Sequence, residues 1–190
     1  TVQRGEDEMR DFYADIKTRM RERGRSPSEC AVLPAVTVVL GETESIARER
    51  ADYLDSLIDP ELTMASASSN LGADLTKLDT GKTLADLQGN QGMQGSQDIV
   101  EQVMKAEGLS LKEAAARRRA GREMVGTPAM IADRLQAIFE AGVCDGFVLT
   151  PTMFPGMFEQ FCRGVVPELQ RRGLFRTEYT GRTLRENIRG

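Results

Sequence analysis

Apolar residues near the start of the chain recur with helical spacing, in the order i, i+3, i+4, i+7 and i+11: Met9, Phe12, Tyr13, Ile16 and Met20. Charged residues fill the gaps, which predicts an amphipathic helix that ends near Gly24. Residues 31–40 are almost continuously apolar and rich in valine, which is typical of a parallel strand covered on both faces. Thr43 then predicts the N-cap of a second helix.

A second helix and strand can be placed between residues 126 and 149 in the same way. Thr127 predicts an N-cap, Pro128 stands where a helix tolerates proline, and Gly142 ends the helix. Residues 143–149 indicate another buried strand. A further helix starts near Met157, and Pro167 is expected to kink it.

The pattern is lost over residues 59–97, which are rich in Gly, Ser, Thr, Asn and Asp. Such a long connection is typical of an insertion or a lid, and its Gly-rich stretch at residues 89–96 is interpreted mainly as connector. Helical spacing resumes at Ile99 and again over residues 110–120, where three arginines, 117–119, favour a solvated helix end over a ligand site. We therefore expect an insertion over residues 59–122, irregular and then helical, and an extended surface tail over residues 175–190.

Helix, strand and helix alternate twice, which predicts an α/β fold with parallel strands and outer helices. Met124 and Val125 are candidates for a short third strand. The length of 190 residues corresponds to one domain.

Amino-acid composition excludes several classes of function but points to no particular one. The formal charge of −4 gives no basic footprint for nucleic acid or an anionic membrane. The chain has no histidine, so histidine-dependent nucleophiles are excluded, and its three cysteines, which include no CxxC pair, indicate neither a metal site nor a disulfide framework. The longest apolar run is half a membrane span. A cytoplasmic protein is expected, with its thiols acting as small apolar fillers.

The predicted ends of the strands indicate where a ligand would bind. Ligands of parallel α/β folds bind at the carboxyl ends of the strands, which here fall near Gly41 and over residues 150–153. Thr150 offers a hydroxyl, while Met153 and Phe154 offer an apolar wall for a flat ring. The alternative, that Thr150 only ends a strand and the two apolar residues pack beneath the last helix, remains open.

Several motifs, in one order along the chain, resemble a known family. Gly126-Thr127-Pro128, residues 141–149 (AGVCDGFVL) and residues 165–188 (VVPELQRRGLFRTEYTGRTLRENI) are similar to the luciferase-like flavin monooxygenases. The similarity is strongest to the nitrilotriacetate, dibenzothiophene-sulfone and pristinamycin monooxygenase subfamily. Val148 departs from the pattern, since many relatives carry asparagine there.

The resemblance implies a (β/α)8 barrel that uses reduced FMN, supplied by a separate flavin reductase, and O2 to oxidise a small organic substrate. Sulfur- and nitrogen-containing compounds are among the candidate substrates. A whole barrel needs about 250 residues, so the chain is expected to be the carboxyl-terminal part of one and inactive alone, within a homo-oligomeric full-length protein. Thr150 and Met153 are the expected cofactor contacts, and no catalytic or metal-binding residue is assigned.

Two other interpretations stay open. The chain could be a non-catalytic interaction module, or a degenerate barrel fragment, that associates through its open sheet edge. The weaker alternative is a helical regulatory protein that binds no cofactor.

Overall fold

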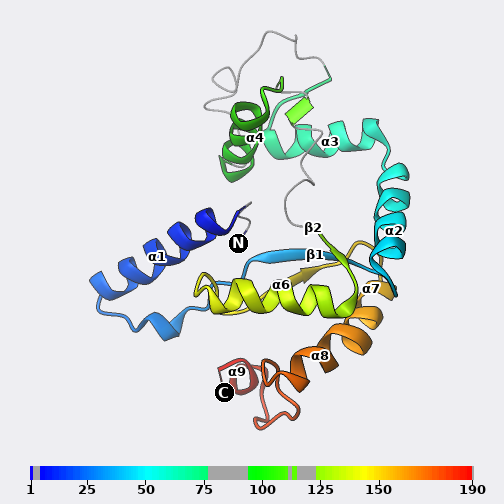
Figure 1. Cartoon of the computed structure of the whole chain (residues 1–190). Coiled ribbons are helices and arrows are strands. Elements are labelled where there is room, and N and C mark those ends of the chain that lie inside the picture. The colour runs from blue at the N-terminus through cyan, green and yellow to red at the C-terminus, as the bar shows by residue number, and fades with distance from the viewer. Residues whose placement is uncertain (2–4, 77–93, 111–112, 115–122, 190) are drawn as a thin grey trace. The chain divides into compact units, whose positions relative to one another are not determined.

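The computed structural model describes residues 1, 5–76, 94–110, 113–114 and 123–189 (Figure 1). The described residues divide into two compact units, Thr1–Tyr53 with Gly121–Gly190 and Leu54–Ala120. The first unit contains a parallel sheet and its helices: α1 (Glu6–Glu22), a 3-10 turn (Pro27–Glu29), β1 (Ala35–Leu40), α2 (Glu44–Ser56, which continues into the second unit), β2 (Glu123–Gly126), α6 (Pro128–Glu140), β3 (Val148–Thr150), α7 (Gly156–Gln160), a π-helical segment (Phe161–Val165), α8 (Val166–Arg171) and α9 (Leu184–Arg189).

The sheet has three strands in the order β2-β1-β3, and both pairings are parallel. Thr37 at the centre of β1 lies opposite Glu123 of β2 and opposite Thr150 of β3. The α/β prediction is therefore confirmed, including the short third strand at Met124 and Val125. The same strands rule out the purely helical alternative.

The helices begin where their capping residues predict. The Thr43 hydroxyl accepts the Ile46 N–H at 3.3 Å ahead of α2, and the Thr127 hydroxyl accepts the Met130 N–H at 3.4 Å ahead of α6. Pro128 occupies the first turn of α6, where its missing N–H costs no hydrogen bond. Gly142 follows the end of α6 with a φ of +67°, a conformation that favours glycine.

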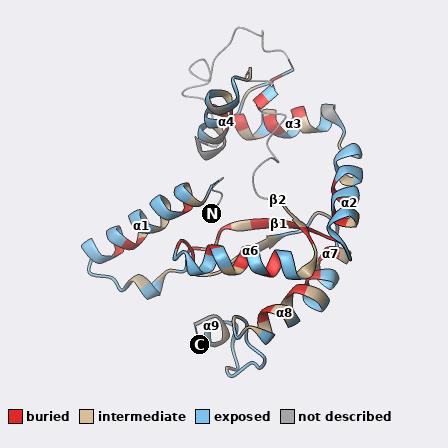
Figure 2. Cartoon of the chain, viewed as in Figure 1, coloured by how far each residue is buried: buried red, intermediate tan, exposed pale blue. Residues whose placement is uncertain are grey.

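One face of the sheet carries the main apolar core. Val36, Val38 and Leu40 of β1 point to this face and pack against the apolar sides of α6, α7, α8 and the π-helical segment. Figure 2 shows buried residues on β1 and along α6, whose remaining surface is exposed. Alternate residues of a strand point to opposite faces, so Ala35, Thr37 and Val39 belong to a second face.

The second predicted strand is shorter than expected. Only Val148–Thr150 form β3, because the residues ahead of it are held by other contacts. Val143 and Cys144 pack with Met9 and Ile138 in a separate small cluster, and the Asp145 N–H donates to the Val32 carbonyl at 2.9 Å. Ladder bonding of β3 starts with the Val148 N–H.

The carboxyl-terminal region also differs from its prediction. The expected kink at Pro167 is a π-helical segment ahead of it, and Pro167 itself lies in the first turn of α8. The tail is not extended throughout, because residues 184–189 form α9. Thr183 and Glu186 explain this helix: the Thr183 hydroxyl accepts the Glu186 N–H at 3.2 Å, and the Glu186 carboxylate accepts the Thr183 N–H at 3.0 Å.

The second unit holds α3 (Pro60–Leu71) and α4 (Gln94–Glu107). The start of the segment predicted to be irregular is therefore helical. Asp59 caps α3 by accepting the Glu61 N–H at 2.7 Å, and Gly72 ends it with a φ of +68°. Small residues make the apolar stripe of α3 weak, and its core is completed by Leu75, Val100 and Val103. Residues 89–93 of the Gly-rich stretch and the arginines at 117–119 lie outside the described residues. The insertion over residues 59–122 stays a prediction.

Candidate functional site

The carboxyl ends of the three parallel strands point to the same side of the sheet. β1 and β2 end level with each other, at Leu40 and Gly126, whereas β3 ends at Thr150, opposite Thr37. The Gly41 N–H donates to the Gly126 carbonyl at 3.2 Å. This edge is the place where parallel α/β folds bind ligands. Helices α2 and α6 begin within a few residues of it.

Gly41 is required by the close approach of α2 to this edge. A Cβ at Gly41 would lie 2.3 Å from the Ala47 nitrogen and 2.8 Å from the Thr43 carbonyl oxygen. Both neighbours are backbone atoms, which cannot move aside as a side chain can. The absence of a side chain at Gly41 therefore sets how α2 leaves β1.

Arg50 and Glu42 close the turn after β1. The Arg50 guanidinium donates to the Leu40 carbonyl at 2.7 Å and to the Glu42 carboxylate at 3.0 Å. The pKa of Glu42 lies below its ordinary value, first because its own backbone N–H donates to the carboxylate and then because of Arg50. The Arg50 guanidinium therefore already has partners within the fold.

Thr150 and Met153, the two expected cofactor contacts, lie at the carboxyl end of β3 and in the turn that follows it. Thr150 is the last residue of β3 and is exposed. Met153 is 52% exposed, and its backbone carbonyl accepts the Met157 N–H at 3.0 Å. The chain thus turns sharply after β3 and leaves the Met153 side chain on the surface beside α7.

Phe154 completes an apolar surface next to Met153. Phe154 is 77% exposed, and its ring meets that of Phe158 edge to face, with centroids 6.0 Å apart and an interplanar angle of 81°. The alternative interpretation, in which Met153 and Phe154 pack beneath the last helix, required both side chains to be buried. Neither side chain is buried. Apolar groups this exposed at a ligand-binding edge favour a contact with something other than the described residues.

A second polar cluster, at the amino ends of the strands, was missed by the sequence analysis. Lys17 is 5% exposed, and its ammonium donates to the carbonyls of Pro27 (2.8 Å) and Cys30 (2.6 Å) and to the Asp145 carboxylate (2.8 Å). Asp145 also accepts the Tyr13 hydroxyl at 2.9 Å and the Val32 N–H at 2.7 Å. This Lys17–Asp145 cluster ties α1 to the segments that precede β1 and β3.

Electrostatics identifies the Lys17–Asp145 cluster as a stabilising contact. Partial burial raises the pKa of Asp145, but hydrogen bonds from Lys17, Val32 and Tyr13 outweigh it and hold the pKa below its ordinary value. Burial, followed by the hydrogen bond to Asp145, raises the pKa of Tyr13. Both groups keep their ordinary charge at neutral pH. In parallel barrels the amino-terminal edge contributes stability and the carboxyl-terminal edge contributes chemistry.

The cysteines are only partly the small apolar fillers that were expected. Cys144 is buried, and burial raises the pKa of its thiol. Cys30 is half-buried and Cys162 is exposed. Within the described ranges, no three side chains of the metal-binding types come together. No described helix is long and apolar enough to cross a membrane.

Comparison with known proteins agrees with this geometry. A sequence model of the luciferase-like monooxygenase family matches residues 1–145. The chain belongs to this family. Dibenzothiophene-sulfone monooxygenase of Rhodococcus erythropolis is 38% identical over 190 residues, covering 95% of this chain and 41% of that relative. Nitrilotriacetate monooxygenase component A of Aminobacter aminovorans is 36% identical over 182 residues, covering 93% of this chain and 40% of that relative.

Solved structures show the same relationship for this luciferase-like chain. A riboflavin lyase, crystallised with modified FMN and its substrate riboflavin, superposes with a TM-score of 0.82 at 25% identity, covering 99% of this chain and 42% of the lyase. The partial α/β barrel expected from the sequence is therefore confirmed. The chain spans about two fifths of the length of the curated relatives it matches.

The residues at the strand ends suit one part of a flavin. Met153 and Phe154 present an exposed apolar surface to a flat ring, and the neighbouring Thr150 presents a hydroxyl. Arg50 is already held by Glu42 and the Leu40 carbonyl, so no phosphate contact is assigned to it. One hydroxyl and two apolar side chains, with no cation among them, are compatible with the uncharged portion of FMN and not with its phosphate.

Proposed function

We propose that the chain is the carboxyl-terminal part of a two-component monooxygenase that uses reduced FMN and O2 to oxidise a small organic substrate. A separate flavin reductase would supply the reduced FMN. The family match over residues 1–145 carries this proposal, supported by relatives that act as monooxygenases. Sulfur- and nitrogen-containing compounds are the first substrates to test, because two relatives are named for such compounds.

In this proposal the chain contributes one wall of the flavin site. Thr150 donates or accepts a hydrogen bond at the edge of the flavin, and Met153 with Phe154 covers one part of the ring and keeps water from it. Bound reduced FMN supplies the electrons that activate O2. The role of these residues is to bind and orient the flavin, which is why a chain without histidine remains compatible with the chemistry.

The experiment uses the native polypeptide that contains these 190 residues, mixed with a flavin reductase, NADH, FMN and ¹⁸O2. Dibenzothiophene sulfone and nitrilotriacetate serve as probe substrates, and mass spectrometry measures oxygen incorporation. The expected result is one labelled oxygen atom per product molecule, formed only when FMN and reductase are both present. A polypeptide that neither binds FMN nor oxidises either probe would contradict the proposal.

The isolated 190 residues are expected neither to turn over substrate nor to bind FMN tightly, because they span two fifths of the relatives' length. Quenching of flavin fluorescence with micromolar affinity by this chain alone would refute that expectation. The alternative function, an interaction module, is favoured by β3, which lies at the edge of the described sheet with Val148 47% exposed. Size-exclusion chromatography of the isolated chain tests this alternative, since a clean monomer would argue against association through an open sheet edge.

The remaining features of the full-length protein stay proposals as well. We infer a homo-oligomer and a cytoplasmic location, the latter because the chain shows no disulfide framework among its cysteines.

A further inference from the structure

The exposed methionines of the described residues both follow the ends of strands. Of the nine methionines in the chain, eight are described. Six of these are buried or half-buried: Met9, Met20, Met64, Met104, Met124 and Met157. The other two are Met130, 38% exposed in the first turn of α6 after β2, and Met153, 52% exposed in the turn after β3. Methionine is mostly a core residue, so their exposure sets these two apart.

Both exposed side chains lie against a glycine instead of in a core pocket. A Cβ at Gly156 would lie 3.0 Å from the Met153 methyl carbon, and a Cβ at Gly126 would lie 3.3 Å from the Met130 sulfur. Glycine at these two positions leaves room for each methionine next to the backbone. By contrast Met157, four residues after Met153, is 2% exposed and belongs to the main core.

The thioether of methionine is a group that peroxides oxidise. Hydrogen peroxide transfers one oxygen atom to the sulfur, which gives methionine sulfoxide and water, so the sulfur is oxidised and the peroxide is reduced. The reagents of the proposed function supply this oxidant, because reduced FMN and O2 give oxidised FMN and hydrogen peroxide when no substrate is present. A buried thioether is reached only when the protein opens locally, so Met153 should react before Met157.

We propose that Met153 is a redox-sensitive modification site, at which oxidation by hydrogen peroxide to the sulfoxide weakens flavin binding. This inference rests on the function proposed above and adds to it a means by which peroxide limits further turnover. The sulfoxide oxygen would bring a strong hydrogen-bond acceptor onto the apolar surface of Met153 and Phe154, where a flat ring would have to displace its bound water. The core would stay intact, because Met153 belongs to none of the three apolar clusters formed by the described residues.

The first measurement is a peptide map of the native polypeptide after brief treatment with hydrogen peroxide. Tandem mass spectrometry reports the fraction of sulfoxide at Met153 and at Met157, which are neighbours in sequence but differ in exposure. We expect Met153 to be oxidised about 10-fold faster than Met157. Equal rates at the two residues would overturn the inference. This map requires neither a variant nor a bound flavin.

The second measurement compares FMN dissociation constants before and after peroxide treatment, by quenching of flavin fluorescence, in the wild type, Met153→Leu and Met130→Leu. Leucine has nearly the volume of methionine and no sulfur to oxidise. Met130→Leu is the matched control, because it removes the other exposed thioether. Each protein is compared with its own untreated sample, so oxidation of the exposed Cys162 thiol contributes equally to all three.

Peroxide should weaken FMN binding by about 3- to 10-fold in the wild type and in Met130→Leu, and it should leave FMN binding by Met153→Leu unchanged. Methionine sulfoxide reductase should restore the affinity of the wild type. An equal loss of affinity in Met153→Leu would overturn the inference and leave the proposed function intact. A wild-type polypeptide that binds no FMN before treatment would refute the proposed function, and this inference with it.

Discussion

Replacing Asp145 with asparagine should destabilise the fold through a single well-defined contact. The Asp145 carboxylate joins the buried Lys17 ammonium at 2.8 Å and also accepts from Tyr13 and Val32. Asparagine keeps the size of the side chain but removes its negative charge and turns one acceptor into a donor. The Lys17 ammonium would then remain buried without a charged partner, with the Pro27 and Cys30 carbonyls and at most one neutral amide oxygen as acceptors.

The size of the effect follows from how much of this ion pair is buried. The Lys17 side chain is 6% exposed and that of Asp145 is 30% exposed. Breaking a fully buried pair by removing one partner costs about 3–5 kcal/mol, and solvent at Asp145 screens part of that. We therefore expect Asp145→Asn to lower the free energy of unfolding by about 2–3 kcal/mol.

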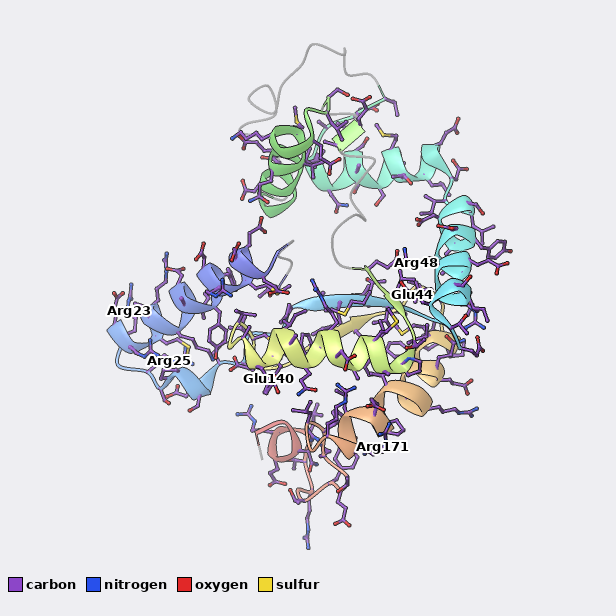
Figure 3. All side chains as sticks on the ribbon, viewed as in Figure 1. Arg23, Arg25, Glu44, Arg48, Glu140 and Arg171 are labelled. Carbon is purple, nitrogen blue, oxygen red and sulfur yellow. The ribbon has the colours of Figure 1, made fainter. Side chains whose placement is uncertain are left out.

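The measurement is urea denaturation of the wild type and the variant at pH 7, followed by far-ultraviolet circular dichroism. Glu44→Gln is the control, because Glu44 forms an exposed pair with Arg48 on the surface of α2 (Figure 3) and its loss should fall within experimental error. If Asp145→Asn unfolds at the same urea concentration as the wild type, the Lys17–Asp145 cluster does not hold these segments together.

Two further outcomes follow from the same structure. Because the folded-state pKa of Asp145 is lowered, its contribution is complete above the ordinary value near 4 and is lost as the pH falls through the folded value. The stability gap between wild type and Asp145→Asn should therefore shrink as the pH falls below about 4, and a constant gap contradicts this. Gly41→Ala should lower the free energy of unfolding by about 1–3 kcal/mol, because the new Cβ would meet backbone atoms of α2 and force the helix from its place. A urea midpoint equal to that of the wild type would refute the packing argument.

Strong local signals predicted most of the sheet-forming unit. The caps at Thr43 and Thr127 and the valine-rich β1 were readable because each depends on neighbouring residues alone. The extent of β3 was wrong because Val143 and Cys144 are apolar for another reason: they pack against α1 and α6. An apolar pattern indicates that a segment is buried. Whether its backbone also forms a strand depends on tertiary contacts.

Helices α3 and α9 were not predicted, because the sequence features that define them are polar capping residues and not an apolar stripe. Helix α3 is announced by Asp59 and Pro60 and ended by Gly72, yet its apolar stripe is too sparse to be recognised. Helix α9 is announced by Thr183 and Glu186, a capping box within a basic and polar segment. In both cases the caps carried more information than the hydrophobic period.

The sequence predicted where the candidate site lies, but not which distant residues come together around the sheet. Strand direction alone places Thr150 and Met153 at and after the carboxyl end of β3, so their location follows from local sequence. The partnership of Lys17 with Asp145, 128 residues apart, and the alignment of Glu123 with Thr37 depend on register. Register is fixed by long-range pairing that a single sequence does not display.

The two edges of the sheet differ in how far their side chains are engaged in contacts within the fold. At the amino-terminal edge, the Lys17 ammonium makes three hydrogen bonds within the fold and Asp145 accepts from three donors. At the carboxyl-terminal edge, Thr150, Met153 and Phe154 remain exposed. Strands β1 and β3 begin next to the Lys17–Asp145 cluster, so this cluster can hold their register without using the residues proposed to contact the flavin. An enzyme family that changes substrates on a constant barrel needs this separation.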